Sequence, residues 1–215
     1  NGCGVERGSV DKLLRRLIER ADGGRTPETV ARSTMLIRDR VGFLFGTGVI
    51  AGYLREYYGT GVPSPWTAAR VLTRAVGSTL VGGALVRRMA ATVRAEVTFQ
   101  DGTRWAERDY LSVAAGTVDQ IGLGFRPFHR VHERLGAFHL LGIHTSAVGF
   151  AQDLPRIHRG VGIQPDKALD ALTDRAVIRF TDPAAGYMFD GDLLDVGAEP
   201  LVLAAGPTLQ VATLR

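Results

Sequence analysis

The sequence contains little cysteine, little lysine and no long apolar run. Its 215 residues include one cysteine, Cys3, so no disulfide can form within the chain, which suits a reducing compartment. No uninterrupted apolar stretch approaches the roughly 18 residues of a membrane-spanning helix. The first residues also have no apolar core of the signal-peptide type. We therefore expect a cytoplasmic protein, whose 45% hydrophobic residues suffice for a large domain with its own core.

Arginine carries almost all of the positive charge. The chain has 26 basic and 22 acidic residues, a formal net charge of +4, and lysine only at Lys12 and Lys167. A basic surface favours anionic lipid head groups or nucleic acid. Because no basic-aromatic stripe, zinc knuckle or recognition-helix pattern accompanies the charge, we expect no nucleic-acid partner.

His129, His132 and Glu133 lie close together in sequence and raise the question of a zinc site. Their spacing is not His-Glu-x-x-His, and the sequence offers no third ligand beside them. His139 and His144 belong to a different segment, a presumed strand. We interpret the histidines as structural or surface residues and assign no metal ligand.

Short apolar segments separated by glycine turns dominate the chain and predict strands. A helix-like segment over 66–88 carries Arg70, Arg74, Arg87 and Arg88 near its ends, and suits either a lipid-facing lid or, more commonly, a helix that covers a sheet. The pattern predicts a mainly β, α+β fold: a two-sheet antiparallel β-sandwich with an N-terminal amphipathic helix and one covering helix. The predicted strands are 29–38, 41–48, 91–99, 103–107, 110–117, 137–143, 176–180, one that begins at Gly186 and ends at Asp190-Gly191-Asp192, 201–207 and 209–214. The predicted helices are 9–21, 49–58, 66–88 and, as a short helix or loop, 147–159, with one more helical turn at 166–172.

The triplet Asp190-Gly191-Asp192 is the strongest candidate site. Two carboxylates that flank a glycine at the end of a strand could accept a proton or hold a metal, because glycine lets the backbone turn sharply. Asp-Gly is also the commonest signal of a short hairpin turn. The residues alone favour the turn.

The order of residues around this triplet resembles the C-terminal part of the diacylglycerol kinase catalytic family, which includes bacterial lipid kinases and sphingosine kinases. An aromatic strand and the triplet in 186–194, followed by the two apolar segments of 199–211, carry the resemblance. In that family a strand runs into Asp-Gly-Glu, and the glutamate is the proposed base that deprotonates the lipid hydroxyl. The resemblance implies that Asp192 is the base, one methylene shorter. It also implies that Asp190 orients Asp192 or approaches the metal–phosphate side, and that Gly191 allows close approach.

Two motifs of the resembled family are missing from the chain. Its Gly-Gly-Asp-Gly-Thr loop, which cradles ATP phosphates, is nowhere in these residues. Its acid that holds a structural magnesium ion would fall at Leu135, before Gly136. The resemblance therefore implies that ATP and Mg²⁺ are bound mainly by an upstream lobe, with residues 1–25 as a remnant helix of that lobe and 26–215 as the sandwich domain. We expect this chain alone to be inactive.

The function that the resemblance implies is the substrate-binding and catalytic half of an ATP-dependent lipid kinase. It would phosphorylate a diacylglycerol-like or sphingoid-base hydroxyl, with the lipid and a transient, peripheral contact with a membrane surface as partners. A sandwich that binds lipid or a protein partner and has lost kinase chemistry is the alternative, and an NAD-kinase-like enzyme is a related one. The particular lipid and the oligomeric state stay open, a homodimer included.

Overall fold

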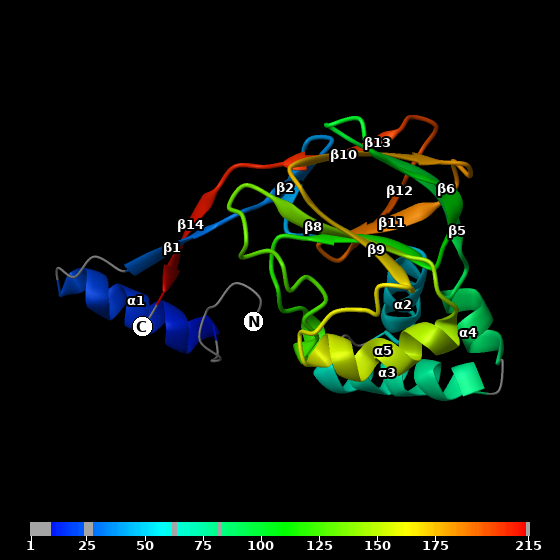
Figure 1. Cartoon of the computed structure of the whole chain (residues 1–215). Coiled ribbons are helices and arrows are strands. Elements are labelled where there is room, and N and C mark those ends of the chain that lie inside the picture. Colours follow the sequence, from blue (N-terminus) through cyan, green and yellow to red (C-terminus); the bar gives the residue numbers. More distant parts are fainter. Residues whose placement is uncertain (1–9, 24–27, 62–63, 81–82, 214–215) are drawn as a thin grey trace.

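The computed structural model describes residues 10–23, 28–61, 64–80 and 83–213. Two antiparallel six-stranded sheets face each other, which confirms the predicted sandwich (Figure 1). The first sheet has the order β3 (Arg40–Gly42), β2 (Met35–Ile37), β13 (Leu201–Ala205), β10 (Arg175–Phe180), β5 (Val93–Phe99) and β6 (Arg104–Tyr110). The second has the order β12 (Asp192–Asp195), β11 (Gly186–Phe189), β4 (Leu44–Thr47), β7 (Ser112–Gly116), β8 (Phe138–Ile143) and β9 (Ala168–Thr173).

The two sheets differ in how many of their faces are covered. In the first sheet, Ala176 and Ile178 of β10 are fully buried, while Arg175 before them and Arg179 after them are exposed. This alternation is typical of a sheet with one face toward a core and one toward solvent. In the second sheet every residue of β7 and of β8 is buried. Both faces of the second sheet are therefore covered.

A layer of helices covers the outer face of the second sheet (Figure 1). Helix α2 contacts β4, β7, β11 and β12, and also the neighbouring helices α3 and α4. A second apolar cluster, which includes Leu111, Ala114, Leu141 and Ile143, lies apart from the core between the sheets. The layer consists of α2 (Val49–Tyr58), α3 (Pro65–Leu80), α4 (Ala84–Met89), α5 (Ala147–His158) and the short 3₁₀ turn η1 (Gly122–Gly124).

Several predicted elements are divided or replaced in the structure. The single helix predicted over 66–88 is two helices, α3 and α4, with Gly82 and Gly83 in the sequence between them; each glycine disfavours a helix by about 1 kcal/mol. The helical turn predicted at 166–172 is wrong, because these residues enter β9 and pair with β8. The strand predicted over 29–38 is also divided, into β1 (Glu28–Arg32) and β2.

Strands β1 and β14 (Leu209–Thr213) pair as a two-stranded ribbon that extends away from the sandwich, next to helix α1 (Val10–Asp22) (Figure 1). The predicted N-terminal helix is thus present. Leu14 and Ile18, two apolar residues of this helix, are 51% and 58% exposed. Cys3 lies outside the described residues. None of the helices in the described ranges is both long and apolar enough to cross a bilayer.

Candidate functional site

Asp190 and Gly191 form the two-residue turn that joins β11 to β12. Phe189 pairs with Asp192 across the hairpin, and the turn residues have φ values of 48° and 101°. Positive φ at both central positions is the geometry that matches the twist of paired strands, and Asp-Gly suits it. The turn interpretation of this triplet is therefore confirmed, and the hairpin holds both carboxylates at one end of the second sheet.

The Asp190 carboxylate anchors the turn to the start of β4. It accepts hydrogen bonds from the backbone N–H groups of Phe43 at 3.0 Å and Leu44 at 2.8 Å. The Asp190 N–H donates in return to the Leu44 carbonyl at 2.9 Å. A Cβ at Gly42 would lie 2.4 Å from the carboxylate, so a side chain there would displace it. Asp190 is therefore committed to positioning the turn.

Asp192, in contrast, points toward solvent. Its side chain is 70% exposed, and one carboxylate oxygen forms an ion pair with Arg40 of β3 at 2.8 Å. Helix α2 supports the turn from another side, since the Tyr58 hydroxyl donates to the Gly191 carbonyl at 2.8 Å. Both acids of the triplet are exposed, but Asp192 is the one whose carboxylate is not bound to backbone N–H groups, and it lies beside a turn fixed by β4 and α2.

Replacement of Tyr58 by phenylalanine should weaken this support. Loss of the hydrogen bond to Gly191 is expected to lower the free energy of unfolding by about 0.5 to 1.5 kcal/mol, measured by urea denaturation. Tyr57→Phe is the matched control, because the Tyr57 hydroxyl is 3.5 Å from the Ser64 carbonyl and makes a weak bond at most. Equal losses in the two variants would contradict a specific role for Tyr58.

A polar cavity of about 110 Å³ lies near the same end of the second sheet. Thr117, which follows β7, donates its N–H to the Phe43 carbonyl at 3.0 Å, so Phe43 connects the cavity wall to Asp190. Thr117 is 5% exposed, and its hydroxyl has no hydrogen-bond partner among the described residues. The cavity is lined by Ala31, Arg32, Ser33, Thr117, Val118, Val131, His132 and Leu135.

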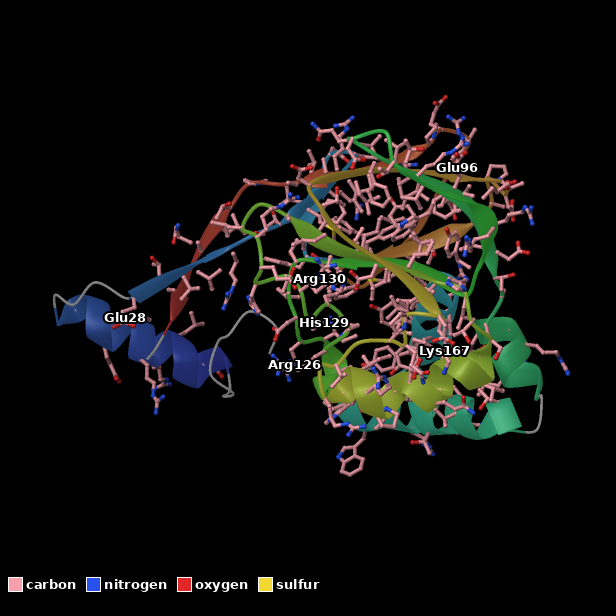
Figure 2. All side chains as sticks on the ribbon, viewed as in Figure 1. Glu28, Glu96, Arg126, His129, Arg130 and Lys167 are labelled. Atoms are coloured by element: carbon pink, nitrogen blue, oxygen red, sulfur yellow. The ribbon has the colours of Figure 1, made fainter. Side chains whose placement is uncertain are left out.

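A charged cluster fixes the segment between β7 and β8 against the second sheet (Figure 2). Arg130 of this segment bonds Glu133 at 3.0 Å and also Asp170 of β9. Asp170 in turn bonds Nε2 of the fully buried His139 at 2.7 Å. Burial opposes ionisation of Asp170, but His139 and Arg130 outweigh it and hold the pKa of Asp170 below its ordinary value. The same contacts raise the pKa of Arg130.

The depressed pKa of Asp170 predicts a pH-dependent stability. Because the folded-state pKa lies below the unfolded value near 3.8, ionised Asp170 stabilises the fold above that value, and the contribution is lost as pH falls through the folded pKa. Asp170→Asn should cost about 1 to 2 kcal/mol at pH 7 and lose less further stability in acid than the wild type. Asp174→Asn is the control, since Asp174 is 53% exposed and 3.9 Å from Arg134. Parallel pH profiles for wild type and Asp170→Asn would contradict the assignment.

The residues of the candidate zinc pattern have separate partners. His132 lies 3.7 Å from Asp119, Glu133 bonds Arg130, and the His129 ring packs edge-on against His139 with centroids 5.2 Å apart. Within the described ranges no three His, Cys, Asp or Glu side chains form a group able to hold a metal ion. We therefore derive no chemical step through a metal ion held by these residues.

Sequence reasoning identified the triplet but missed the residues that surround it. Arg40 and Tyr58 lie 152 and 133 positions from their partners in the turn, so no local spacing connects them. Thr117 was recognised only as the end of a buried strand. Its position beside the cavity depends on the β4–β7 pairing.

The comparisons with known proteins identify the fold of the chain and do not identify its reaction. No protein-family model and no curated protein matches the chain. Among solved structures, a diacylglycerol kinase from Bacillus anthracis str. Sterne matches with a TM-score of 0.57 and 11% identity, over 95% of this chain and 58% of that one. A further protein of that strain, assigned as a diacylglycerol kinase, matches with a TM-score of 0.62 and 11% identity, over 95% of this chain and 60% of that one.

The protein is thus an α+β sandwich of a kinase-like fold. That fold is the one seen in these diacylglycerol kinase structures, and the resemblance noted in the sequence is confirmed at this level. The chain spans about three fifths of the length of the two structures.

Proposed function

We propose that the chain is the substrate-binding and catalytic part of a lipid kinase that phosphorylates a hydroxyl of a diacylglycerol-like or sphingoid lipid. The observation that carries the proposal is the exposed Asp192 carboxylate on a turn held from two sides, in the fold of the diacylglycerol kinase structures. An exposed acid on a fixed turn suits proton transfer, because it is both accessible and positioned.

In this proposal each residue of the turn has one task. Asp192 accepts the proton of the lipid hydroxyl as that oxygen bonds to the γ-phosphorus of ATP and the bond from this phosphorus to the leaving ADP breaks. Asp190 is a positioning residue, since its carboxylate is occupied by the backbone of Phe43 and Leu44. The phosphoryl donor would be ATP with Mg²⁺, both bound mainly by residues outside this chain, because the chain lacks the Gly-Gly-Asp-Gly-Thr loop of the resembled family.

The polar cavity supplies a site for the oxygen-rich end of the lipid. The hydroxyls of Thr117 and Ser33, which line the cavity, can donate to ester or hydroxyl oxygens of a lipid head group. The cavity volume of about 110 Å³ suits a small polar head group better than an acyl chain. The Ser33 oxygen accepts from the Gly136 N–H at 2.9 Å, which leaves its hydroxyl proton for a ligand. The acyl chains would then extend outside the cavity.

Thr117→Val tests whether the cavity binds the lipid, because stability and lipid affinity should respond differently to this change. Removal of a buried hydroxyl that has no protein partner should leave the free energy of unfolding unchanged or raise it by about 1 kcal/mol. The same change should raise KM for the lipid several-fold with little change in kcat. Thr103→Val, in the exposed β5–β6 turn, is the control for lipid affinity. An unchanged KM in Thr117→Val would remove the cavity from the proposal.

A second candidate function is a lipid- or partner-binding sandwich without kinase chemistry. The ion pair between Asp192 and Arg40 favours it, because a carboxylate oxygen that already accepts a hydrogen bond from a guanidinium is occupied by that partner. Phosphate transfer from labelled ATP to a lipid panel separates the two functions. Transfer by the full-length protein supports the kinase, whereas lipid binding without transfer supports the binding module.

A further inference from the structure

One exposed side of helix α3 carries a tryptophan near its first turn and two arginines after it, and it has no acidic residue. The exposed side of α3 consists of Trp66, Arg70, Thr73, Arg74 and Gly77, which recur at helical spacing and are called here the α3 face. Trp66 is 86% exposed. Tryptophan is enriched at protein interfaces and at membrane surfaces, because its ring is apolar while its N–H can stay in contact with water.

The charge around the α3 face has one sign. Residues 57–95 contain five arginines and neither Asp nor Glu. Among the described residues, no hydrogen bond or ion pair holds the guanidinium of Arg70 or Arg74. Both side chains are therefore available to an external anion.

The acidic residues of the adjoining helices do not neutralise this face. Glu56 of α2 pairs with Arg88 at 3.1 Å. Asp153 of α5 is fully buried and lies 3.4 Å from the Lys167 ammonium. The α3 face therefore keeps its positive potential.

We infer that the α3 face docks the protein on a bilayer of anionic phospholipid. Arginines attract the phosphate and carboxylate groups of such a surface, while a tryptophan inserts at the level of the head groups. The inference deepens the proposed function, since it names the surface on which the lipid substrate would be met. It does not depend on catalysis, because binding to a vesicle needs no nucleotide.

The structure connects this face to the candidate site through α2. The Tyr53 hydroxyl of α2 donates to the Ala68 carbonyl of α3 at 2.9 Å, and the Tyr58 hydroxyl of the same helix donates to Gly191. Docking through α3 would therefore hold the Asp192 turn in a fixed orientation relative to the bilayer. A lipid kinase needs that geometry, because its substrate does not leave the membrane readily.

Other occupants fit this face less well. Single-stranded nucleic acid needs several aromatic platforms for its bases, but Tyr53 and Tyr57 stack on each other with centroids 6.3 Å apart and are not free. A second copy of the chain across a two-fold axis would bring Arg70 and Arg74 against like charges. An anionic bilayer meets both features of the face at once.

The test is co-sedimentation of the 215-residue chain with phosphatidylserine–phosphatidylcholine vesicles and with pure phosphatidylcholine vesicles, without nucleotide. Arg70→Gln/Arg74→Gln should weaken partition to the anionic vesicles about fivefold per arginine, hence roughly 25-fold. Arg175→Gln/Arg179→Gln is the control, because it removes the same charge from exposed positions of β10 in the first sheet. This variant should change the partition to anionic vesicles by less than about twofold. Arg70→Lys/Arg74→Lys keeps the charge and should keep most of the binding.

Tryptophan fluorescence gives an independent readout. Anionic vesicles should shift the emission to shorter wavelength in the wild type and in Trp105→Phe, but not in Trp66→Phe, because Trp105 packs edge-on against Phe99 inside the sandwich. Three results would overturn the inference. They are equal binding to both kinds of vesicle, equal losses of binding in Arg70→Gln/Arg74→Gln and Arg175→Gln/Arg179→Gln, and binding to an RNA oligonucleotide in place of vesicles. Lipid phosphorylation that fails while vesicle binding persists would refute the kinase proposal alone.

Discussion

Replacement of Asp192 by asparagine is expected to lower phosphate transfer to lipid by about 10² to 10⁴-fold in the full-length protein, the range that a positioned general base contributes. Asparagine keeps the size of the side chain but removes its negative charge, and with it the ability to accept the proton and the ion pair with Arg40. The free energy of unfolding should change by less than about 1 kcal/mol, because an exposed ion pair such as Asp192–Arg40 contributes little.

Asp195→Asn is the matched control for Asp192→Asn. Asp195 is an exposed acid on the same short strand, β12, and pairs with Gly186 at the far end of the hairpin from the turn. It should retain transfer within about twofold, because it lies away from the proposed site. Full activity in Asp192→Asn, or equal losses in the two variants, would show that Asp192 is not the base.

The second large effect is expected from Asp190→Ala, which should lower the free energy of unfolding and, as a consequence, activity. The change removes the acceptor of the Phe43 and Leu44 N–H groups and places alanine at a φ of 48°, a region that Asp and Asn adopt more readily than alanine because their side chains can hydrogen-bond to nearby backbone. Together these should lower the free energy of unfolding by about 2 to 4 kcal/mol, measured by urea denaturation. Transfer should fall as well, because the turn no longer positions Asp192.

Asp190→Asn separates the two causes of that loss. Asparagine tolerates positive φ and keeps one acceptor oxygen, so its stability should lie between those of the wild type and Asp190→Ala. Asp190 and Asp192 should therefore differ in kind: substitution of Asp190 affects both stability and activity, whereas substitution of Asp192 affects activity alone. An Asp190→Ala variant as stable as the wild type would contradict the anchoring role.

The sandwich could be predicted from the sequence because the residues of many strands alternate between apolar and polar according to which side of the sheet they face. Alternating burial, as at Ala95 and Val97 of β5, leaves a period of two that is visible in the residues themselves. Strand β9 was misread as a helical turn, since its burial does not alternate and only its pairing with β8 defines it. Local pattern is a weak guide where a partner strand decides the structure.

The candidate site could be predicted only at its centre. Asp190-Gly191-Asp192 carries both a turn signal and two acids in consecutive positions, so sequence alone placed it. The ion pair with Arg40 and the support from Tyr58 arise from tertiary contacts between segments more than 130 positions apart. The charge of the α3 face was visible in the sequence, whereas its exposure depends on which side of α3 packs against the layer.

The most direct test of the account is phosphate transfer from labelled ATP to diacylglycerol, monoacylglycerol and sphingoid-base lipids, with the full-length protein beside this 215-residue chain. The account predicts transfer to at least one of these lipids by the full-length protein and none by the 215-residue chain. It also predicts loss of that transfer in Asp192→Asn. An absence of transfer by the full-length protein, with folding and lipid binding intact, would contradict the kinase and support a binding module.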